Sequence, residues 1–229
     1  MLKPKLKKLS QKKRETAEVI SFQTIRRAVG WFGILLPVVL VLGSFIFDHC
    51  QALQPSISHY YYTNMREIFV GVLGSVSLFL FTYKGFSTLD SIASSMAGFF
   101  SLTVALFPTD IINGFPCQTD VTSVFNVSFH DKIHLVSAAL FFITLALMSI
   151  FLFTKSKHIK ARQTPQKRIR NVIYIVTGII MLSCIAAIGI YFLTKGNPKS
   201  QVVFWFEALA LLAFGISWLT KGEALFGDK

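Results

Sequence analysis

The sequence predicts an all-α, polytopic integral membrane protein, a bundle of six transmembrane helices with both termini in the cytoplasm. The first observation is composition, because 53% of the 229 residues are hydrophobic and the mean hydropathy is +0.58, more apolar than a soluble domain needs. The second is that apolar residues form six runs, and about 20 such residues span a hydrocarbon core of about 30 Å. The third is charge placement, since 19 of the 23 Lys and Arg residues lie in segments that this topology puts on one side.

The net charge of +12 is therefore interpreted as a topology signal. Lys and Arg collect in the cytoplasmic loops of membrane proteins, and here they crowd the first 27 residues and the connector 154–171. A basic chain can also indicate nucleic acid as a partner. Here the basic residues lie in the predicted cytoplasmic segments, and the membrane topology explains them without such a partner. We expect membrane lipids as partners, no nucleic acid, and a location in a membrane. The sequence does not indicate the oligomeric state.

The chain divides into a basic cytoplasmic tail (1–27), a transmembrane domain (28–219) and a short cytoplasmic tail (220–229). Helices are expected at residues 28–47, 68–83, 92–107, 135–153, 172–193 and 202–219. Pro37 lies inside the first run and is expected to kink it, because proline lacks a backbone N–H. The second run is short for a complete span.

A polar segment between the first two runs, residues 48–67, is the densest polar and aromatic cluster in the chain. The predicted topology places it on the non-cytoplasmic side, together with the 108–130 loop. Tyr60, Tyr61 and Tyr62 are expected to anchor the protein at the headgroup level, where amphipathic rings collect.

Two cysteines and one carboxylate belong to the same side. Cys50 and Cys117 lie where oxidation is permitted, and they either form a disulfide or remain free thiols. Glu207 lies about one and a half turns into the last helix, roughly 8 Å deep at 1.5 Å per residue. An isolated carboxylate at that depth is costly, so Glu207 is expected to face the bundle and to have a partner or a proton.

His130 and His134 stand one helical turn apart at the start of the fourth run. Residues at i and i+4 share a helix face, so both imidazoles are expected to point the same way, as a pair of metal ligands must. With His59 they would supply three nitrogens for a catalytic zinc ion, with water as the fourth ligand. A zinc-bound water becomes a nucleophile near neutral pH when a carboxylate acts as base. The other residues expected at such a site are Asp110, Glu207 and Ser58.

The alternative interpretation of this pair is structural. Histidines at a helix start also cap the helix and hydrogen-bond to carbonyl groups of a neighbouring loop, and a His-x-x-x-His spacing arises often by chance. Both interpretations place the two rings on one helix face, so the spacing alone does not decide between them.

The order Ser56-Ile57-Ser58-His59, then Asp110, then His130-x-x-x-His134 resembles the polar pattern of the CREST superfamily of membrane hydrolases. That group includes alkaline ceramidases and the progestin and adipoQ receptors. The resemblance implies about seven helices that hold zinc through three His, with Asp and Ser nearby, and hydrolysis of an amide in a lipid. The chain departs from this pattern. Ser56 precedes His59 by three positions rather than four, and the His pair opens the fourth of six helices rather than lying on the last of seven.

A second resemblance extends over most of the chain. It rests on Ser58-x-Tyr60-Tyr61-Tyr62, Phe107-Pro108-Thr109, Ile133-His134-Leu135 and Phe214-Gly215-x-x-Trp218. This pattern is similar to that of small bacterial multipass membrane proteins grouped as a domain of unknown function. It supports the helical bundle and implies that His134 and the Tyr cluster belong together. It also implies a location in the bacterial inner (cytoplasmic) membrane, but it implies no activity.

Two classes of function follow from these residues. The first is a metal-dependent hydrolase that acts on a lipid or lipid-linked substrate from the non-cytoplasmic side. The second is a non-enzymatic transporter or sensor in which Glu207 and the His cluster bind a proton, an ion or a small solute. A hydrolase needs its ligands to converge on one point, whereas a transporter needs Glu207 to connect to a path toward the cytoplasm.

Overall fold

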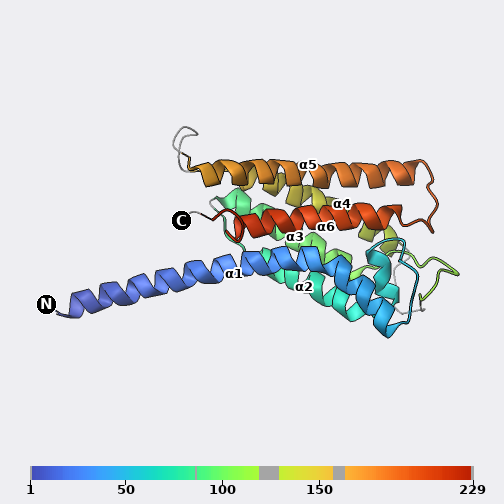
Figure 1. Cartoon of the computed structure of the whole chain (residues 1–229), viewed down its shortest axis with the longest axis horizontal. Helices are drawn as coiled ribbons and strands as arrows, with labels where there is room; N and C mark the ends of the chain where they lie inside the picture. The colour runs from blue at the N-terminus through green and yellow to red at the C-terminus, as the bar shows by residue number, and fades with distance from the viewer. Residues whose placement is uncertain (1, 86, 119–128, 157–162, 228–229) are drawn as a thin grey trace.

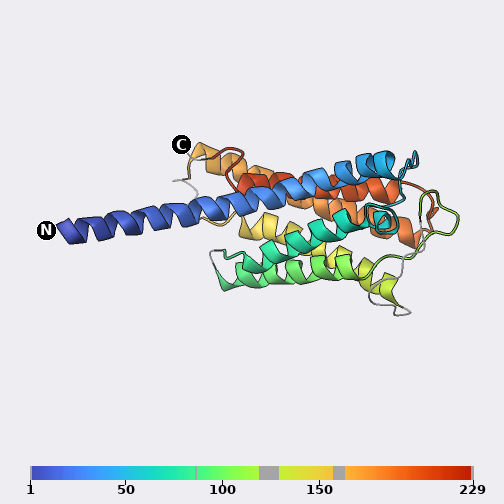
Figure 2. The ribbon, with the colours of Figure 1, turned by 90° about the horizontal axis from the view of Figure 1, so that it is seen from below.

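The computed structural model describes residues 2–85, 87–118, 129–156 and 163–227, with side chains from Phe22 onward. The regular elements in these ranges are all helical: α1 (Leu2–Phe47), the 3₁₀ helix η1 (Ser58–Tyr62), α2 (Arg66–Thr82), α3 (Thr88–Leu106), α4 (His130–Leu147), the π-helical turn η2 (Met148–Leu152), α5 (Pro165–Leu193) and α6 (Val202–Lys221). Helix α6 lies between α1 and α5, while α2 packs on α3 and α3 on α4 (Figures 1 and 2).

Helix α1 is longer than the apolar run that predicts it. It begins at Leu2 and ends at Phe47, and its apolar part, Phe22–Phe47, is long enough to cross a membrane. The preceding part projects beyond the bundle (Figures 1 and 2). The segment predicted as a tail contains no glycine, and Pro4 stands in the first turn, where proline is tolerated. The helix therefore runs through the predicted boundary at residue 27.

Two helices begin several residues before their apolar runs, because polar caps determine where a helix starts. Helix α3 begins at Thr88, where Ser87 and Asp90 form a capping box. Helix α5 begins at Pro165, and the Thr164 hydroxyl accepts a hydrogen bond from the Lys167 backbone N–H at 3.2 Å.

Small residues and hydroxyl groups bring the helices close together, as is usual inside a bilayer. A Cβ atom on Gly30 of α1 would lie 2.9 Å from the Gly215 carbonyl oxygen of α6. A larger residue at position 30 would therefore keep α1 and α6 from packing this closely. Between α2 and α3, the Ser77 hydroxyl donates to the Gly98 carbonyl at 2.7 Å and the Ser101 hydroxyl to the Leu73 carbonyl at 3.0 Å. These contacts fix the bundle on which the polar residues are mounted.

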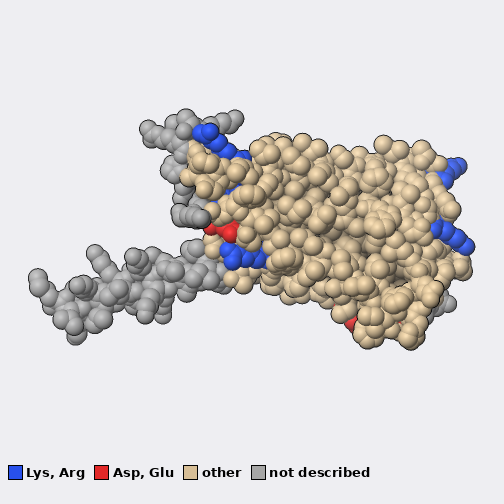
Figure 3. Space-filling model, viewed as in Figure 1, with Lys and Arg blue, Asp and Glu red and all other residues tan. Residues whose placement is uncertain are grey.

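Five of the described helices are long and apolar enough to cross a membrane, and α2, with 17 residues, is shorter than they are. Figure 3 shows the described charged residues gathered near the ends of the bundle, with an uncharged belt between them. The chain is an integral membrane protein with an all-helical fold. A sixth span at α2 and the orientation of the termini stay predictions.

The bundle has two unlike ends. We call the end that carries both chain termini and the described connections 83–85 and 153–156 the terminal end (left in Figure 1). The loop end is the opposite one, where the described residues 48–65, 107–118 and 194–201 lie.

Candidate functional site

Two loops at the loop end are joined covalently and by hydrogen bonds. Cys50 and Cys117 form a disulfide across 67 residues of sequence. The Gln54 amide donates to the Pro116 carbonyl at 3.1 Å, and the Gln118 amide donates to the Gln54 side-chain oxygen at 3.0 Å. Of the two alternatives for the cysteines, pairing is therefore confirmed. The disulfide holds η1 beside the carboxyl end of α3.

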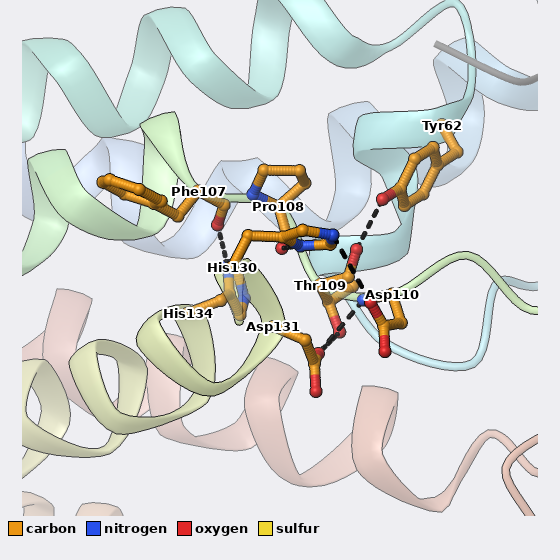
Figure 4. A network of polar contacts seen from close by, with 8 residues as sticks. All are labelled: Tyr62, Phe107, Pro108, Thr109, Asp110, His130, Asp131 and His134. Carbon is orange, nitrogen blue, oxygen red and sulfur yellow. Dashed lines mark hydrogen bonds and ion pairs between the residues drawn. The ribbon is translucent and has the colours of Figure 1, made fainter. Parts of the chain in front are cut away.

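The two histidines of α4 face that same end of α3 (Figure 4). His134 Nδ1 lies 2.6 Å from the Phe107 carbonyl oxygen, and His130 Nδ1 lies 2.8 Å from the Pro108 carbonyl oxygen. Phe107 is the C-cap of α3, where carbonyl groups lack partners within their own helix. His134 supplies a donor for that carbonyl, and His130 supplies one for the carbonyl of the next residue. The prediction that both rings share one face is confirmed, and the contacts are those of the structural interpretation.

The second nitrogen of His134 makes the most informative contact. A carbonyl oxygen only accepts, so Nδ1 carries a proton, and in the neutral ring Nε2 is then an acceptor. His134 Nε2 lies 2.8 Å from the hydroxyl oxygen of Ser58 in η1. His134 is 2% exposed and Ser58 7% exposed. The result is a buried Ser–His pair in which a main-chain carbonyl fixes the tautomer and the orientation of the ring.

A second Ser–His contact joins His59 of η1 to Ser56, which lies just before that helix. The Ser56 hydroxyl lies 2.6 Å from His59 Nδ1, and the His59 backbone N–H donates to the same hydroxyl at 3.3 Å. This pattern is a local turn, in which the Ser56 hydroxyl hydrogen-bonds to groups three residues later. Burial, and then the proximity of His134, lowers the pKa of His59 to about 4. His59 is therefore a neutral imidazole at physiological pH.

Asp131 and Thr109 join the start of α4 to the loop that follows α3. Asp131 Oδ1 accepts from the Thr109 hydroxyl at 2.8 Å and from the Asp110 backbone N–H at 3.0 Å. The Tyr62 hydroxyl donates to the Thr109 carbonyl at 2.5 Å (Figure 4). The side chain of Asp110 is 73% exposed, and its Oδ1 lies 3.5 Å from His130 Nε2.

Glu207 connects α6 to the same loops. Its Oε2 accepts a hydrogen bond from the Ile57 backbone N–H at 2.7 Å. One turn earlier, the Phe204 backbone N–H donates to the Pro55 carbonyl at 3.0 Å. The expectation that Glu207 faces the bundle and has a partner is met, and that partner is the residue before Ser58.

Several of these polar groups, among them Ser58, His134 and Glu207, line one end of a cavity of about 440 Å³. Its remaining walls are apolar side chains of α4 and α5, among them Ala138, Phe142, Ile185 and Phe192. A smaller cavity of about 40 Å³ shares Ser58, Ala138, Phe142 and Glu207 with it and continues to Leu36 and Leu211. The combined space is polar at the loop end and apolar toward the middle of the bundle, the form that suits an amphiphilic ligand.

Five of the six residues predicted for the site line the large cavity: Ser58, His59, Asp110, His134 and Glu207. His130 does not line it. It faces Pro108 and Asp110 instead. The backbone carbonyl of Phe107, which positions His134, could not be found from the sequence because every residue has such a group. The Ser58–His134 contact was also missed, because the two residues are 76 positions apart and belong to no common motif.

The imidazoles do not fit the predicted zinc ion. Among the residues that the structure describes, no three His, Cys, Asp or Glu side chains form a group that could hold a metal. Both ring nitrogens of His134 are engaged by protein groups, and so is Nδ1 of His59 and of His130. A zinc ligand needs a free nitrogen lone pair directed at the metal. The zinc ion stays a prediction, and no chemistry below depends on it.

The expected anchoring role of the three tyrosines is wrong. Tyr60 and Tyr61 are 1% exposed and Tyr62 6%, because η1 folds inward and the rings find partners there. The Tyr61 hydroxyl accepts from the Arg66 guanidinium at 2.7 Å, and the Tyr60 ring packs on Phe204 with centroids 6.4 Å apart. Burial raises the pKa of Tyr60 and of Tyr62 to about 12.

Comparison with known proteins gives one family. No curated protein and no solved structure matches the chain, and the resemblance to the CREST superfamily is not confirmed. A family model described as protein of unknown function (DUF998) matches residues 59–222. This range holds His59 to Tyr62 of η1, the histidines of α4 and Glu207, and it begins one residue after Ser58. Most of the site therefore belongs to the family region. The chain is a member of the DUF998 family of membrane proteins.

Proposed function

We propose that this protein is a membrane-embedded hydrolase that cleaves an acyl bond in a lipid or lipid-linked substrate entering from the loop end. The observation that carries the proposal is the Ser58–His134 contact of 2.8 Å at the polar end of the cavity. A nucleophile within hydrogen-bond reach of a base, and a base oriented by a third group, is the signature of nucleophilic catalysis. Here the third group is the Phe107 carbonyl, 2.6 Å from His134 Nδ1.

The chemical step follows from the tautomer of His134. Ser58 Oγ attacks the carbonyl carbon of the substrate while its proton passes to His134 Nε2. The bond to the leaving alcohol or amine then breaks, and the leaving group takes that proton. Water next attacks the acyl-serine, gives a proton to Nε2 and releases the acid, and the proton returns to Ser58. Asp131, three residues before His134 on the same helix face, places a negative charge near the imidazolium that forms.

The shape of the cavity supports a lipid as the substrate. The reacting groups lie at its polar end, and the walls beyond them are apolar faces of α4 and α5. Those two helices also present apolar side chains outward, including Val136, Leu140 and Ile179. An acyl chain of the substrate would lie along the apolar cavity walls formed by α4 and α5, and the polar part of the substrate would contact Ser58.

The transporter or sensor alternative stays a prediction. The observation relevant to it is that Glu207 lines the cavity, but its carboxylate is held by the Ile57 N–H inside the site. This contact supports a role beside Ser58 more than a role in carrying a proton across the bilayer.

The proposal is tested by hydrolysis in reconstituted vesicles. The full chain is purified in a nonionic detergent and reconstituted with lipids that carry a labelled acyl chain in ester or amide linkage, and released acid is measured by mass spectrometry. We expect wild-type protein to release acid and Ser58→Ala to release none above background. Ser75→Ala is the matched control, because the Ser75 hydroxyl only donates to Gly71 within α2 and lies outside the cavity. Release by Ser58→Ala equal to that of wild type would refute the proposal.

A further inference from the structure

The lining of the large cavity carries charge of one sign. Asp110, Asp131 and Glu207 contribute carboxylates, and no Lys or Arg is among the described residues of the lining. His59, whose pKa is near 4, adds no positive charge at neutral pH. Acidic side chains therefore predominate at the polar end of the cavity, although the chain as a whole has a net charge of +12.

In two of these carboxylates, only one of the two oxygen atoms accepts hydrogen bonds from described residues of the protein. Asp131 Oδ1 accepts two hydrogen bonds and Glu207 Oε2 accepts one. Among the described residues, no hydrogen-bond donor or cation meets Asp131 Oδ2 or Glu207 Oε1. Each carboxylate is thus held in place through one oxygen and has its other oxygen available to a ligand. Buried or half-buried carboxylates normally have a partner of opposite charge, and the described residues form no ion pair with either of these two.

We infer that the amphiphile bound in this cavity carries a positively charged head group, an amine or a quaternary ammonium, beside Asp131 and Glu207. The inference rests on the proposed function for the acyl bond at Ser58, but it adds the chemical class of the substrate. An ammonium group donates to or pairs with carboxylate oxygens, whereas a phosphate or carboxylate head group would meet like charges at short range. The cavity of about 440 Å³ holds a head group and part of one chain, and the rest of the chain lies among the lipids.

The test measures binding and does not need turnover. The full-length Ser58→Ala protein, in a nonionic detergent, is titrated with three single-chain amphiphiles of equal chain length: an alkyltrimethylammonium, a neutral alkyl maltoside and an alkyl phosphate. We expect the ammonium compound to bind about tenfold more tightly than the neutral one and the phosphate to bind more weakly than both. Equal affinity for the ammonium and phosphate compounds would overturn the inference.

Isosteric variants connect the preference to the carboxylates. Glu207→Gln keeps an oxygen that accepts from Ile57 but loses the charge, so the protein should fold and its preference for the ammonium compound should fall several-fold. Asp131→Asn should have a smaller effect in the same direction. Glu67→Gln is the control, because Glu67 is an exposed carboxylate at the same end that lies outside this cavity. An unchanged preference in Glu207→Gln would also overturn the inference.

The two proposals fail in different ways. If the ammonium compound binds with the expected preference but wild-type protein releases no acid from any labelled lipid, the hydrolase is refuted and the cationic ligand stands. If wild-type protein hydrolyses lipids and the titrations show no preference for positive charge, the hydrolase stands and the inference about the head group is refuted.

Discussion

The two ends of the bundle both contain buried polar and charged side chains, but they use them differently. At the terminal end, Asp90 is 2% exposed and lies 3.1 Å from Lys155 Nζ. Lys221 Nζ lies 4.9 Å from the centre of the Phe153 ring, and Arg26 lies 5.4 Å from that of Tyr83. Each of these four charged side chains meets an ion-pair partner or an aromatic face inside the protein. At the loop end, carboxylates and Ser58 face a cavity.

This difference distinguishes polar side chains that stabilise the fold from polar side chains that are available to a ligand. Polar groups satisfied by protein partners stabilise the fold and help to set its orientation in the membrane. Polar groups that face an internal space leave part of their bonding capacity to a ligand. We therefore expect substitutions at the loop end to change activity and binding more than stability, and substitutions at the terminal end to do the reverse.

The largest effect is expected from removing the base. His134→Gln should lower the rate of acyl release by about 10³-fold, within the range for general-base catalysis, because a glutamine amide does not take the proton from Ser58. The rate is measured with the labelled lipids described above, and a thermal melt monitors folding. A variant that keeps its fold and more than a tenth of the wild-type rate would contradict the assigned role.

At the terminal end, Asp90→Ala should cost about 3 kcal/mol of stability, because it removes the partner of Lys155 and half of the α3 capping box. Binding of the alkyltrimethylammonium per folded molecule should not change. The two quantities are read from a denaturation curve and from the titration. A stability loss below about 0.5 kcal/mol, or a tenfold change in affinity, would contradict the separation of the two ends.

Acid pH should destabilise the loop end through His59. Its pKa in the folded protein, about 4, lies below the unfolded value of 6.5, so the unfolded chain binds more protons between these values. Stability is therefore complete above pH 6.5 and falls as the pH drops toward 4, by on the order of 2 kcal/mol at pH 5. Melting curves at pH 7.5 and 5 check this, with His59→Gln as the variant whose pH dependence should shrink. Equal pH dependence in both proteins would contradict it.

The smallest effect is expected at a ring contact of the terminal end. Lys221→Met keeps the aliphatic stem and removes the charge over Phe153, which should cost about 1 kcal/mol. Acyl release should stay at the wild-type rate. A fall in the rate without a change in the melting temperature would show that the terminal end takes part in activity.

Much of the fold could be predicted from the sequence, because apolar runs and basic loops report directly on a bilayer. Helix starts were less predictable, since Ser87 and Thr164 set them through polar caps outside the apolar runs. The inward fold of Tyr60 to Tyr62 was not predictable from composition, because an aromatic run fits a membrane interface and a protein interior equally well.

The candidate site was partly predictable. Helical spacing placed His130 and His134 on one face, and the polar segment before α2 supplied Ser58 and His59. The spacing could not reveal that the neighbouring face would be the carbonyl end of α3 rather than a metal. That outcome depends on how α3 packs on α4, which is a tertiary contact without a local sequence signal.

The most direct test of the central claim is covalent labelling of Ser58. A lipid-like fluorophosphonate is incubated with the full-length protein in nonionic detergent, and the modified residue is located by mass spectrometry of the digested protein. We expect the phosphonate on Ser58 Oγ with loss of fluoride, at a rate that falls at least tenfold in His134→Gln, and no modification of Ser56. Absence of label on Ser58 in folded wild-type protein, or equal labelling in His134→Gln, would contradict the account.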